Sequence, residues 1–373
     1  MFTLSLLSKE VFPVGKVKEF MKRKDIVISA KRYGIDALSA MAQGLFCSLL
    51  IGTILDTLGT QLGIDALVTV GEYASAMSGP AMAVAIGYAL NAPPLVLFSL
   101  ATVGYAANAL GSTTLSGGSG AGGPLAVLFI AIIAAECGKA VSKETKVDIL
   151  VTPLVTILVG VGLSALIAPA IGTAASAVGN LVMWATELQP FLMGILVSVL
   201  VGMALTLPIS SAAICAALGL TGLAGGAAVA GCCAQMVGFA VMSFKENGWG
   251  GLVSQGLGTS MLQMGNIVRN PRIWIAPTLT SAITGPIATC VFHLEMNGAA
   301  VSSGMGTCGL VGQIGIYSGW VSDVASGAKE AITAFDWAGL ILICFVLPAV
   351  LSTIFCEIER RLGWIKEGDL KLN

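Results

Sequence analysis

Charged side chains are scarce in this sequence. They account for 10% of the 373 residues, whereas soluble domains average about 25%. Hydrophobic residues account for 56%, and the mean hydropathy is +0.90. A soluble chain of this size could not bury so much apolar surface. The composition therefore predicts an all-α polytopic membrane protein.

The chain also lacks a basic surplus and a set of metal ligands. Its net charge is −1, so it has no cationic face to displace counterions, and nucleic acid is excluded as a partner. The only histidine is His293, and none of the nine cysteines shows C-x-x-C spacing. We therefore expect no metal site and no cofactor, and we interpret the cysteines as reduced, small hydrophobic residues.

Recognisable catalytic sets are missing too. The sequence has no Ser/His/Asp set and no paired carboxylates at helical spacing, so no catalytic residue is predicted. The glycine-rich segment 111–123 lacks the G-x-x-x-x-G-K-[ST] pattern of a nucleotide-binding loop. Because this segment lies between apolar runs, it indicates a tight crossing or a short re-entrant element, with an exposed loop as the alternative.

Residues 1–34 form a basic, amphipathic segment. Eight Lys or Arg side chains are interspersed among apolar ones, and they follow the first apolar residues. A secretory signal peptide has the opposite order, so we interpret the segment as an interfacial helix in contact with membrane lipids. The basic residues next to the first span also predict a cytoplasmic N-terminus, and Arg360, Arg361 and Lys366 predict a cytoplasmic tail at 359–373.

The apolar runs divide the rest of the chain into two halves. We place a first helical half at 35–171, an amphipathic linker at 172–189 and a second half at 190–358. Cytoplasmic termini imply an even number of crossings, and we expect about ten. The apolar run 212–244 exceeds the ~20 residues of one span, so we predict a break at Gly225-Gly226. The run 297–318 is predicted to be a re-entrant hairpin.

The stretch 256–277 is expected to form one wall of a solute site. Irregular backbone and amides at membrane depth persist only where they are buried in protein or line a watery cavity. Carboxamides donate to and accept from hydroxyl groups, so we predict a binding site for a small polar solute, a sugar or polyol. The alternative is that the amides link neighbouring helices. The candidate substrate-binding residues are Gln263, Asn266, Gln235, Ser260, Thr259 and Asn270.

Other polar side chains receive structural interpretations. Glu136 is expected at a helix end near the interface, and His293 at a helix end without a functional role. Asp56, near the far end of the first span, marks the opposite membrane surface. For Arg269 and Arg272 two interpretations stay open, contact with an anionic group and snorkelling to the interface.

Three stretches resemble the membrane IIC subunit of bacterial phosphoenolpyruvate-dependent sugar phosphotransferase systems. The run LGTSMLQMGNIVRNPRIWIAPTLTSAITGPIATCVF is similar to the segment that holds the family's Gly-Ile-Thr/Asn-Glu-Pro motif and the Asn-Pro helix after it. The run GGPLAVLFIAIIAAECGKAVSKETKVDILVTPLVTILVG resembles a helix, charged loop and helix of the first half, and NGAAVSSGMGTCGLVGQIG resembles the second hairpin. The likeness is closest to a divergent branch that includes PfoR-type membrane regulators.

The resemblance implies an architecture and a mechanism. Such subunits lie in the bacterial cell membrane, with about ten membrane helices, two re-entrant hairpins, an amphipathic linker and a homodimer interface in the first half. In the family, a motif carboxylate orients a sugar hydroxyl and helps to deprotonate it, and the hydroxyl attacks phosphocysteine on a separate IIB subunit. This chain instead reads Thr259-Ser260-Met261-Leu262 followed by Gln263, and an amide cannot accept that proton.

The leading hypothesis is a IIC-like transporter subunit that binds a sugar-like solute and moves it by a rigid-body, elevator-type shift of one half against the other. Two alternatives stay open. One is a membrane sensor or regulator that kept the fold without phosphotransfer, and the other is a secondary transporter on the same scaffold. We expect at most the membrane component of a phosphotransferase system, because the motif acid is missing and this sequence contains no IIA or IIB domain.

Overall fold

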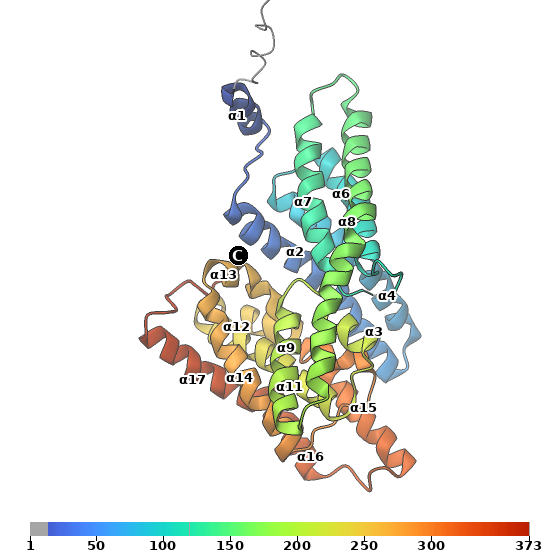
Figure 1. Cartoon of the computed structure of the whole chain (residues 1–373), viewed down its shortest axis with the longest axis vertical. Helices are drawn as coiled ribbons and strands as arrows, with labels where there is room; N and C mark the ends of the chain where they lie inside the picture. The colour runs from blue at the N-terminus through green and yellow to red at the C-terminus, as the bar shows by residue number, and fades with distance from the viewer. Residues whose placement is uncertain (1–13, 119, 373) are drawn as a thin grey trace, which may run out of the picture.

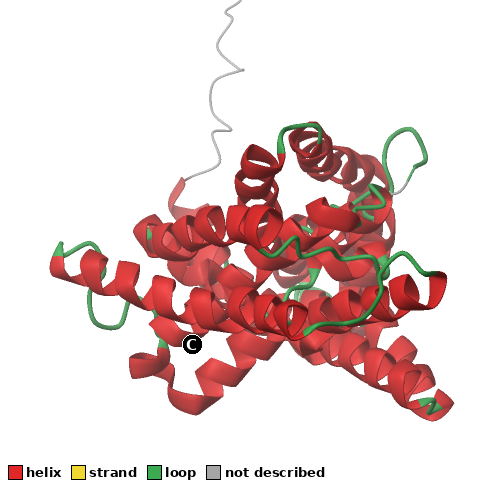
Figure 2. Cartoon of the chain, turned by 90° about the horizontal axis from the view of Figure 1, so that it is seen from below, coloured by secondary structure: helices red, strands yellow, loops and turns green. Residues whose placement is uncertain are grey.

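The computed structural model describes residues 14–118 and 120–372, and every regular element in this part is a helix or helical turn (Figures 1 and 2). Residues 1–13 of the predicted amphipathic segment lie outside the described residues, and its remainder contains helix α1, Val14–Arg23. One isolated bridge joins Gly222 to Met296. The all-α fold is confirmed.

Short connections join the helices. The first-half helices after α1 are α2 (Leu38–Leu45), α3 (Ile51–Leu62), α4 (Asp65–Ala76), α5 (Ser78–Ala89), α6 (Pro94–Gly111), α7 (Gly123–Val141) and α8 (Asp148–Thr186). They are followed by α9 (Pro190–Thr206), α10 (Ser211–Ala217), α11 (Gly222–Met242), α12 (Phe244–Val253), α13 (Met264–Arg269), α14 (Ile275–Pro286), α15 (Val311–Ser326), α16 (Ala334–Ile341) and α17 (Leu347–Arg361). Turns of 3-10 or π pitch occupy Arg32–Ala37, Phe46–Leu50, Ser254–Gly258, Ser260–Gln263, Pro271–Trp274, Ile287–Val291, Ala300–Gly304, Cys308–Leu310 and Leu342–Val346.

Seven helical runs among the described residues are long and apolar enough to cross a membrane. They are Arg32–Leu62, Pro94–Gly111, Gly123–Val141, Asp148–Thr186, Gly222–Met242, Pro271–Val291 and Ala334–Arg361. Helix α9 is apolar but shorter. A multi-pass membrane protein is therefore confirmed, whereas the count of about ten crossings and the re-entrant hairpins stay predictions.

Helices α2, α5, α6, α7 and α8 pack around one hydrophobic core, which extends into the second half through residues such as Phe239 and Met264. In Figure 1, α6, α7 and α8 stand side by side at the top of the view. Helix α8 is continuous over 39 residues and contacts α9 beyond the first half. Residues 172–186 of the predicted linker thus prolong α8 instead of forming an element of their own, and the span does not end at residue 171.

Ion pairs attach α1 to the first half. Arg23 pairs with Glu144 in the α7–α8 loop at 2.8 Å. The ammonium group of Lys139, which is buried, donates to the carbonyl of Leu90 at 2.9 Å and lies 3.1 Å from the Glu136 carboxylate. These contacts place α1, the α7–α8 loop and the end of α7 at one end of the molecule, and they bond Glu136 within the protein.

Helix α11 is the centre of the second half. It packs against α9, α14 and α17, and nearly all of its residues are buried. Small residues allow this contact: a Cβ added at Gly231 would lie 1.8 Å from the carbonyl oxygen of Ser198 on α9. Close approach of this kind is typical of helices in membranes, where small side chains permit backbone contact.

The break in the 212–244 run lies earlier than predicted. Helix α11 is regular through Gly225-Gly226, so a break at that pair is wrong. The chain turns instead between α10 and α11, where Gly219 and Gly222 have φ of +59° and +62°. Glycine adopts such backbone at little cost because it has no Cβ. The turn lies against a later segment, since Gly222 exchanges backbone hydrogen bonds of 3.0 Å with Met296.

Candidate functional site

A cavity of about 640 Å³ lies between α3 and the second half of the chain. Its volume is within the range of about 300–1,000 Å³ that is typical of ligand pockets. Helix α3 forms one wall, and the other consists of the end of α9, the start of α10 and parts of the segments 259–261, 299–305 and 311–318. The cavity therefore lies where the two predicted halves meet.

One face of α3 supplies half of the polar lining residues. Its cavity-lining polar residues are Thr53, Asp56, Thr57, Thr60 and Gln61. Intervals of three and four residues place side chains on one helix face. The hydroxyls of Thr53 and Thr57 donate to carbonyls one turn earlier, at 2.8 and 2.7 Å. Since their protons are used within the helix, their oxygen lone pairs are the groups left to accept hydrogen bonds in the cavity.

Packing fixes which face of α3 meets the cavity. Helix α4 contacts α3 closely through glycine: a Cβ at Gly71 would lie 2.7 Å from the backbone nitrogen of Asp56. On the side of the second half, a Cβ at Gly309 would lie 2.3 Å from the Ile54 side chain. These contacts hold α3 against α4 and against the Cys308–Leu310 turn, so its polar face is oriented by the fold.

The opposite wall is built from irregular backbone and serine hydroxyls. The Ser210 hydroxyl caps α10 by accepting from the backbone nitrogen of Ala213 at 3.1 Å. The Ser211 hydroxyl donates to the carbonyl of Gly304 at 2.7 Å, which ties α10 to the Ala300–Gly304 turn. Ser302 of that turn also lines the cavity. Two short elements, a seven-residue α-helix and a 3-10 turn, thus meet at this wall.

The cavity carries a single charged side chain. Among its lining residues only Asp56 is ionisable as an acid or base, and no Lys, Arg or His is present. Within the described part of the chain, Asp56 has no ion-pair partner. The lining therefore combines one carboxylate with several hydroxyl groups and the Gln61 amide, so it offers both donors and acceptors.

Of the predicted site residues, Thr259 lines the cavity. Its backbone is extended, with φ of −159°, and separates the turns on either side, while its hydroxyl accepts from the Met261 nitrogen at 3.2 Å. The neighbouring Ser260 points elsewhere and bonds Thr206 of α9 at 2.8 Å. The stretch 256–277 does form part of a cavity wall, but only through Thr259 and Met261.

Gln235 occupies a buried junction of α9, α11 and α14. Its side-chain oxygen accepts from the Trp274 indole nitrogen at 2.9 Å and from the Thr206 hydroxyl at 3.2 Å. Its amide nitrogen lies 3.4 Å from the Thr278 hydroxyl. Through Thr206, Gln235 and Ser260 belong to one hydrogen-bonded group. In this conformation the group links helices and is not part of the cavity lining.

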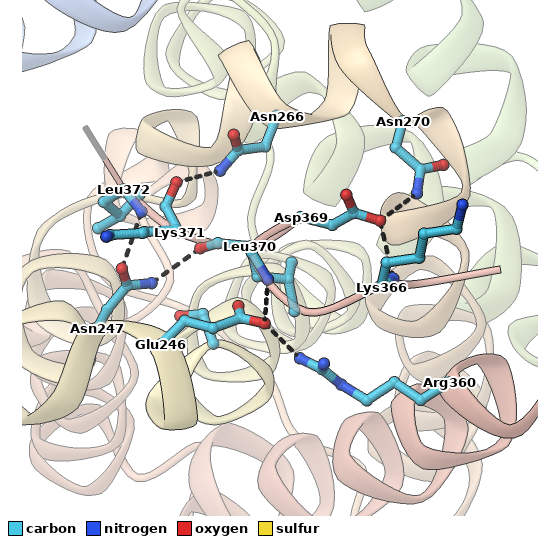
Figure 3. Close-up of polar contacts among 12 residues, drawn as sticks. Glu246, Asn247, Asn266, Asn270, Arg360, Lys366, Asp369, Leu370, Lys371 and Leu372 are labelled. Atoms are coloured by element: carbon cyan, nitrogen blue, oxygen red, sulfur yellow. Dashed lines mark hydrogen bonds and ion pairs between the residues drawn. The ribbon is translucent and has the colours of Figure 1, made fainter. Parts of the chain in front are cut away.

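Gln263 and Asn266 are brought together as the sequence predicts, and both bind the segment 364–372. The Gln263 amide donates to the Leu370 carbonyl at 2.9 Å, and Asn266 donates to the Lys371 carbonyl at 2.9 Å. Asn266 also donates to Gln263 at 2.7 Å. Figure 3 shows the Asn266 side chain pointing at the backbone of Lys371, near the end of the segment.

Asn270 and α12 complete the attachment of this segment. Asn270 donates to the Asp369 carboxylate at 2.9 Å. Asn247 donates to the Leu370 carbonyl and accepts from the Leu372 nitrogen, both at 2.8 Å. Glu246 accepts from Arg360 at 3.0 Å and from the Gly368 nitrogen at 3.3 Å (Figure 3). The amides that the sequence assigns to a solute are engaged by the protein's own backbone in this conformation.

The α3 face was missed by sequence reasoning, although its signal is present. Polar residues recur at helical spacing from Thr53 to Gln61 within a span that is otherwise apolar. Taken one at a time, Asp56 indicates only the end of a span. The spacing as a whole indicates a polar face that needs a watery or polar neighbour.

Comparison with known proteins gives one clear match. Residues 35–372 match the model of the family described as phosphotransferase system, EIIC. No curated protein and no solved structure matches the chain. Because the family match covers the two helical halves and the cavity between them, the chain belongs to the phosphotransferase system EIIC family, and it is a multi-pass IIC membrane component of that system.

Proposed function

We propose that this IIC subunit binds a small polar solute, a sugar or polyol, in the cavity between α3 and the second half, and translocates it. The observation that carries the proposal is the polar face of α3, which meets the hydroxyls of Ser210, Ser211 and Ser302 across about 640 Å³. Hydroxyl-rich solutes both donate and accept, and they match such a lining. Apolar residues such as Leu49 and Ile314 complete the walls.

The cavity's position supports an elevator-type mechanism. One wall belongs to the first half, 35–171, and the other to the second half, 190–358. A shift of one half against the other would therefore change access to a solute held between them. We propose that the first half forms the homodimer interface and that 172–189 links the halves. We also propose about ten membrane helices and two re-entrant hairpins, with 297–318 of the second half as one of the hairpins.

We also propose on which side of the membrane the chain termini lie and which partner subunit acts with the protein. We propose that both termini lie in the cytoplasm of a bacterial cell, because basic residues flank the first and last spans. A separate IIB subunit would supply the phosphoryl group. Residues 259–263 provide no acid, and the Gln263 amide cannot act as a base, so binding and translocation are proposed here without an assigned proton acceptor.

For the buried amides we propose a conditional role. Contact of Gln263, Asn266 and Asn270 with a solute requires that the segment 364–372 first leave them, because it uses their amide donors. Gln235 and Ser260 would similarly have to exchange helix contacts for solute contacts. Thr259 needs no such change, since it already lines the cavity.

A second candidate function is a membrane sensor or regulator. The engagement of the predicted amides by residues 364–372 favours it, because a chain that no longer transports can fill this region with its own backbone. Ligand-independent signalling and absent uptake in liposomes would support this candidate. A secondary transporter on the same scaffold would be established by uptake that depends on an ion gradient and needs no IIB subunit.

The proposed function is tested by a thermal-shift screen of the purified protein against sugars and polyols. A ligand at 100 times its Kd stabilises the folded state by about 2.7 kcal/mol. If no sugar or polyol in the screen raises the midpoint of thermal unfolding, the proposed solute binding is refuted.

The cavity is tested by Thr57→Val, which removes one hydroxyl and leaves the side-chain shape. One neutral hydrogen bond contributes about 0.5–1.5 kcal/mol, so the affinity should fall about two- to tenfold. The matched control is Thr69→Val on α4, since Thr69 also donates one turn back but is exposed and does not line the cavity. Equal loss in both variants would assign the solute to another place.

A further inference from the structure

We propose that Asp56 sets the substrate class: its carboxylate binds two hydroxyls of an uncharged sugar or polyol and keeps acidic sugars out of the cavity. This inference rests on the proposed function, because it concerns the same cavity. It adds a specificity-determining residue that lies outside the stretch 256–277, on the opposite wall.

Asp56 lies at the centre of the polar face of α3, between Thr53 and Thr60, and its side chain is half-buried in the cavity wall. Close packing of Gly71 on its backbone holds this position. A carboxylate has two acceptor oxygens and no donor. It can therefore accept from two neighbouring hydroxyls of one solute while the solute's own oxygens face the serine hydroxyls opposite.

The lining contains no Lys, Arg or His, and Asp56 has no ion-pair partner among the described residues. An acidic solute would bring a second negative charge into a space where nothing neutralises either. Like charges close together in a partly desolvated site oppose each other more strongly than in water. An uncharged solute meets no such opposition.

The hydroxyls of Thr53 and Thr57, which flank Asp56, donate to carbonyls of their own helix. They are therefore not the partners that satisfy the carboxylate. Thr60 and Gln61 lie on the same face, and among the described residues neither donates a hydrogen bond to Asp56. The missing donors are supplied most directly by a solute with adjacent hydroxyl groups, which is the chemistry of sugars and polyols.

The experiment compares probes that differ in one group. Sorbitol and gluconate form such a pair, as do glucose and glucuronate. Their affinities are measured on the full-length, purified protein by thermal shift and calorimetry, for the wild type, Asp56→Asn and Asp56→Glu. The control is Asp65→Asn, because Asp65 is an exposed acid at the start of α4 and does not line the cavity.

The wild type should bind the uncharged member of a pair at least tenfold more tightly, which is about 1.4 kcal/mol. Asp56→Asn should lose about tenfold in affinity for the uncharged probe and should no longer discriminate against the acid. Asp56→Glu keeps the charge and should still exclude the acid, even with weaker binding of the uncharged probe. Asp65→Asn should behave as the wild type.

Three outcomes would overturn the proposal. Equal wild-type affinity for the uncharged and acidic probes would refute charge selection, and unchanged binding by Asp56→Asn would refute the role of this residue; in both cases solute binding itself stands. If the wild type binds none of the probes and no other sugar or polyol in the screen, the proposed function fails together with the inference. Folding of Asp56→Asn is checked by its thermal unfolding midpoint without ligand, which should equal that of the wild type.

Discussion

Attachment of the segment 364–372 is open to a quantitative test through Asn247. Replacing Asn247 by Ala removes two hydrogen bonds, one to the Leu370 carbonyl and one from the Leu372 nitrogen, each 2.8 Å long. A net contribution of about 1 kcal/mol for each gives a loss of about 2 kcal/mol. The Leu370 carbonyl keeps its bond to Gln263, so no buried acceptor is orphaned and the loss stays within this range.

Hydrogen exchange of individual amides measures this effect. A loss of 1–2 kcal/mol changes an opening equilibrium by a factor of about 5–30. Exchange at Leu372 and Gly368 should accelerate by that factor in Asn247→Ala, because these amides are bonded to α12. Exchange within the helical core should not change, since local opening does not require global unfolding.

The controls separate a local effect from a general one. Asn180→Ala removes an exposed asparagine on α8 and should leave the exchange of both amides as in the wild type. Asn247→Asp keeps an acceptor for Leu372 but turns a carboxylate oxygen towards the Leu370 carbonyl, and this repulsion should accelerate exchange at Leu372 at least as much as Ala does. Unchanged rates at Leu372 and Gly368 in Asn247→Ala would show that the side-chain contacts do not hold the segment.

Two further predictions concern packing and pH. Gly231→Ala should lower the midpoint of thermal unfolding, because the new Cβ would meet the backbone of α9. Overpacking of this kind lowers the free energy of unfolding by about 1–3 kcal/mol. The control is Gly250→Ala, which has open space around the new Cβ and should leave the midpoint unchanged. The hydrogen bond from Arg32 lowers the pKa of Asp25 to about 2, below the ordinary value of 3.8. The Asp25 carboxylate therefore stabilises the folded state above about pH 4, and this stabilisation is lost as the pH falls through about 2. The thermal unfolding midpoints of the wild type and of Asp25→Asn should converge over that pH range. A difference that stays constant with pH would contradict the Asp25–Arg32 interaction as the cause.

The sequence determined the class of protein and much of the outline. Hydropathy adds up along the chain regardless of contacts, so 56% hydrophobic and 10% charged residues were enough to predict a polytopic helical membrane protein. The resemblance over three stretches was enough to predict the family, which the match over 35–372 confirms. Gln263 and Asn266 lie three residues apart in the sequence, and their side chains are hydrogen-bonded because residues at this spacing meet on one helical turn.

Other features depended on contacts that no local pattern encodes. Glycine can adopt both helical and turn backbone conformations. The sequence alone therefore did not show that Gly225-Gly226 is helical and that Gly219 and Gly222 form the turn. Helix α8 continues past residue 171 where it packs against α9. The sequence indicated where the chain could bend, and packing selected among those places.

In the candidate site, too, the sequence determined some features and the tertiary structure determined others. An amide in a membrane needs a hydrogen-bond partner, and the sequence shows this need at Gln263 and Asn266. Only the tertiary structure identifies the partner, which is the backbone of Leu370 and Lys371, about a hundred residues later in the chain. The polar spacing around Asp56 was equally visible, but a helix face acquires a role only from what lies opposite. Packing of α4 on one side and the broken segments of the second half on the other turned that face towards a cavity. Side-chain chemistry is local, whereas the identity of a partner is a long-range property of the fold.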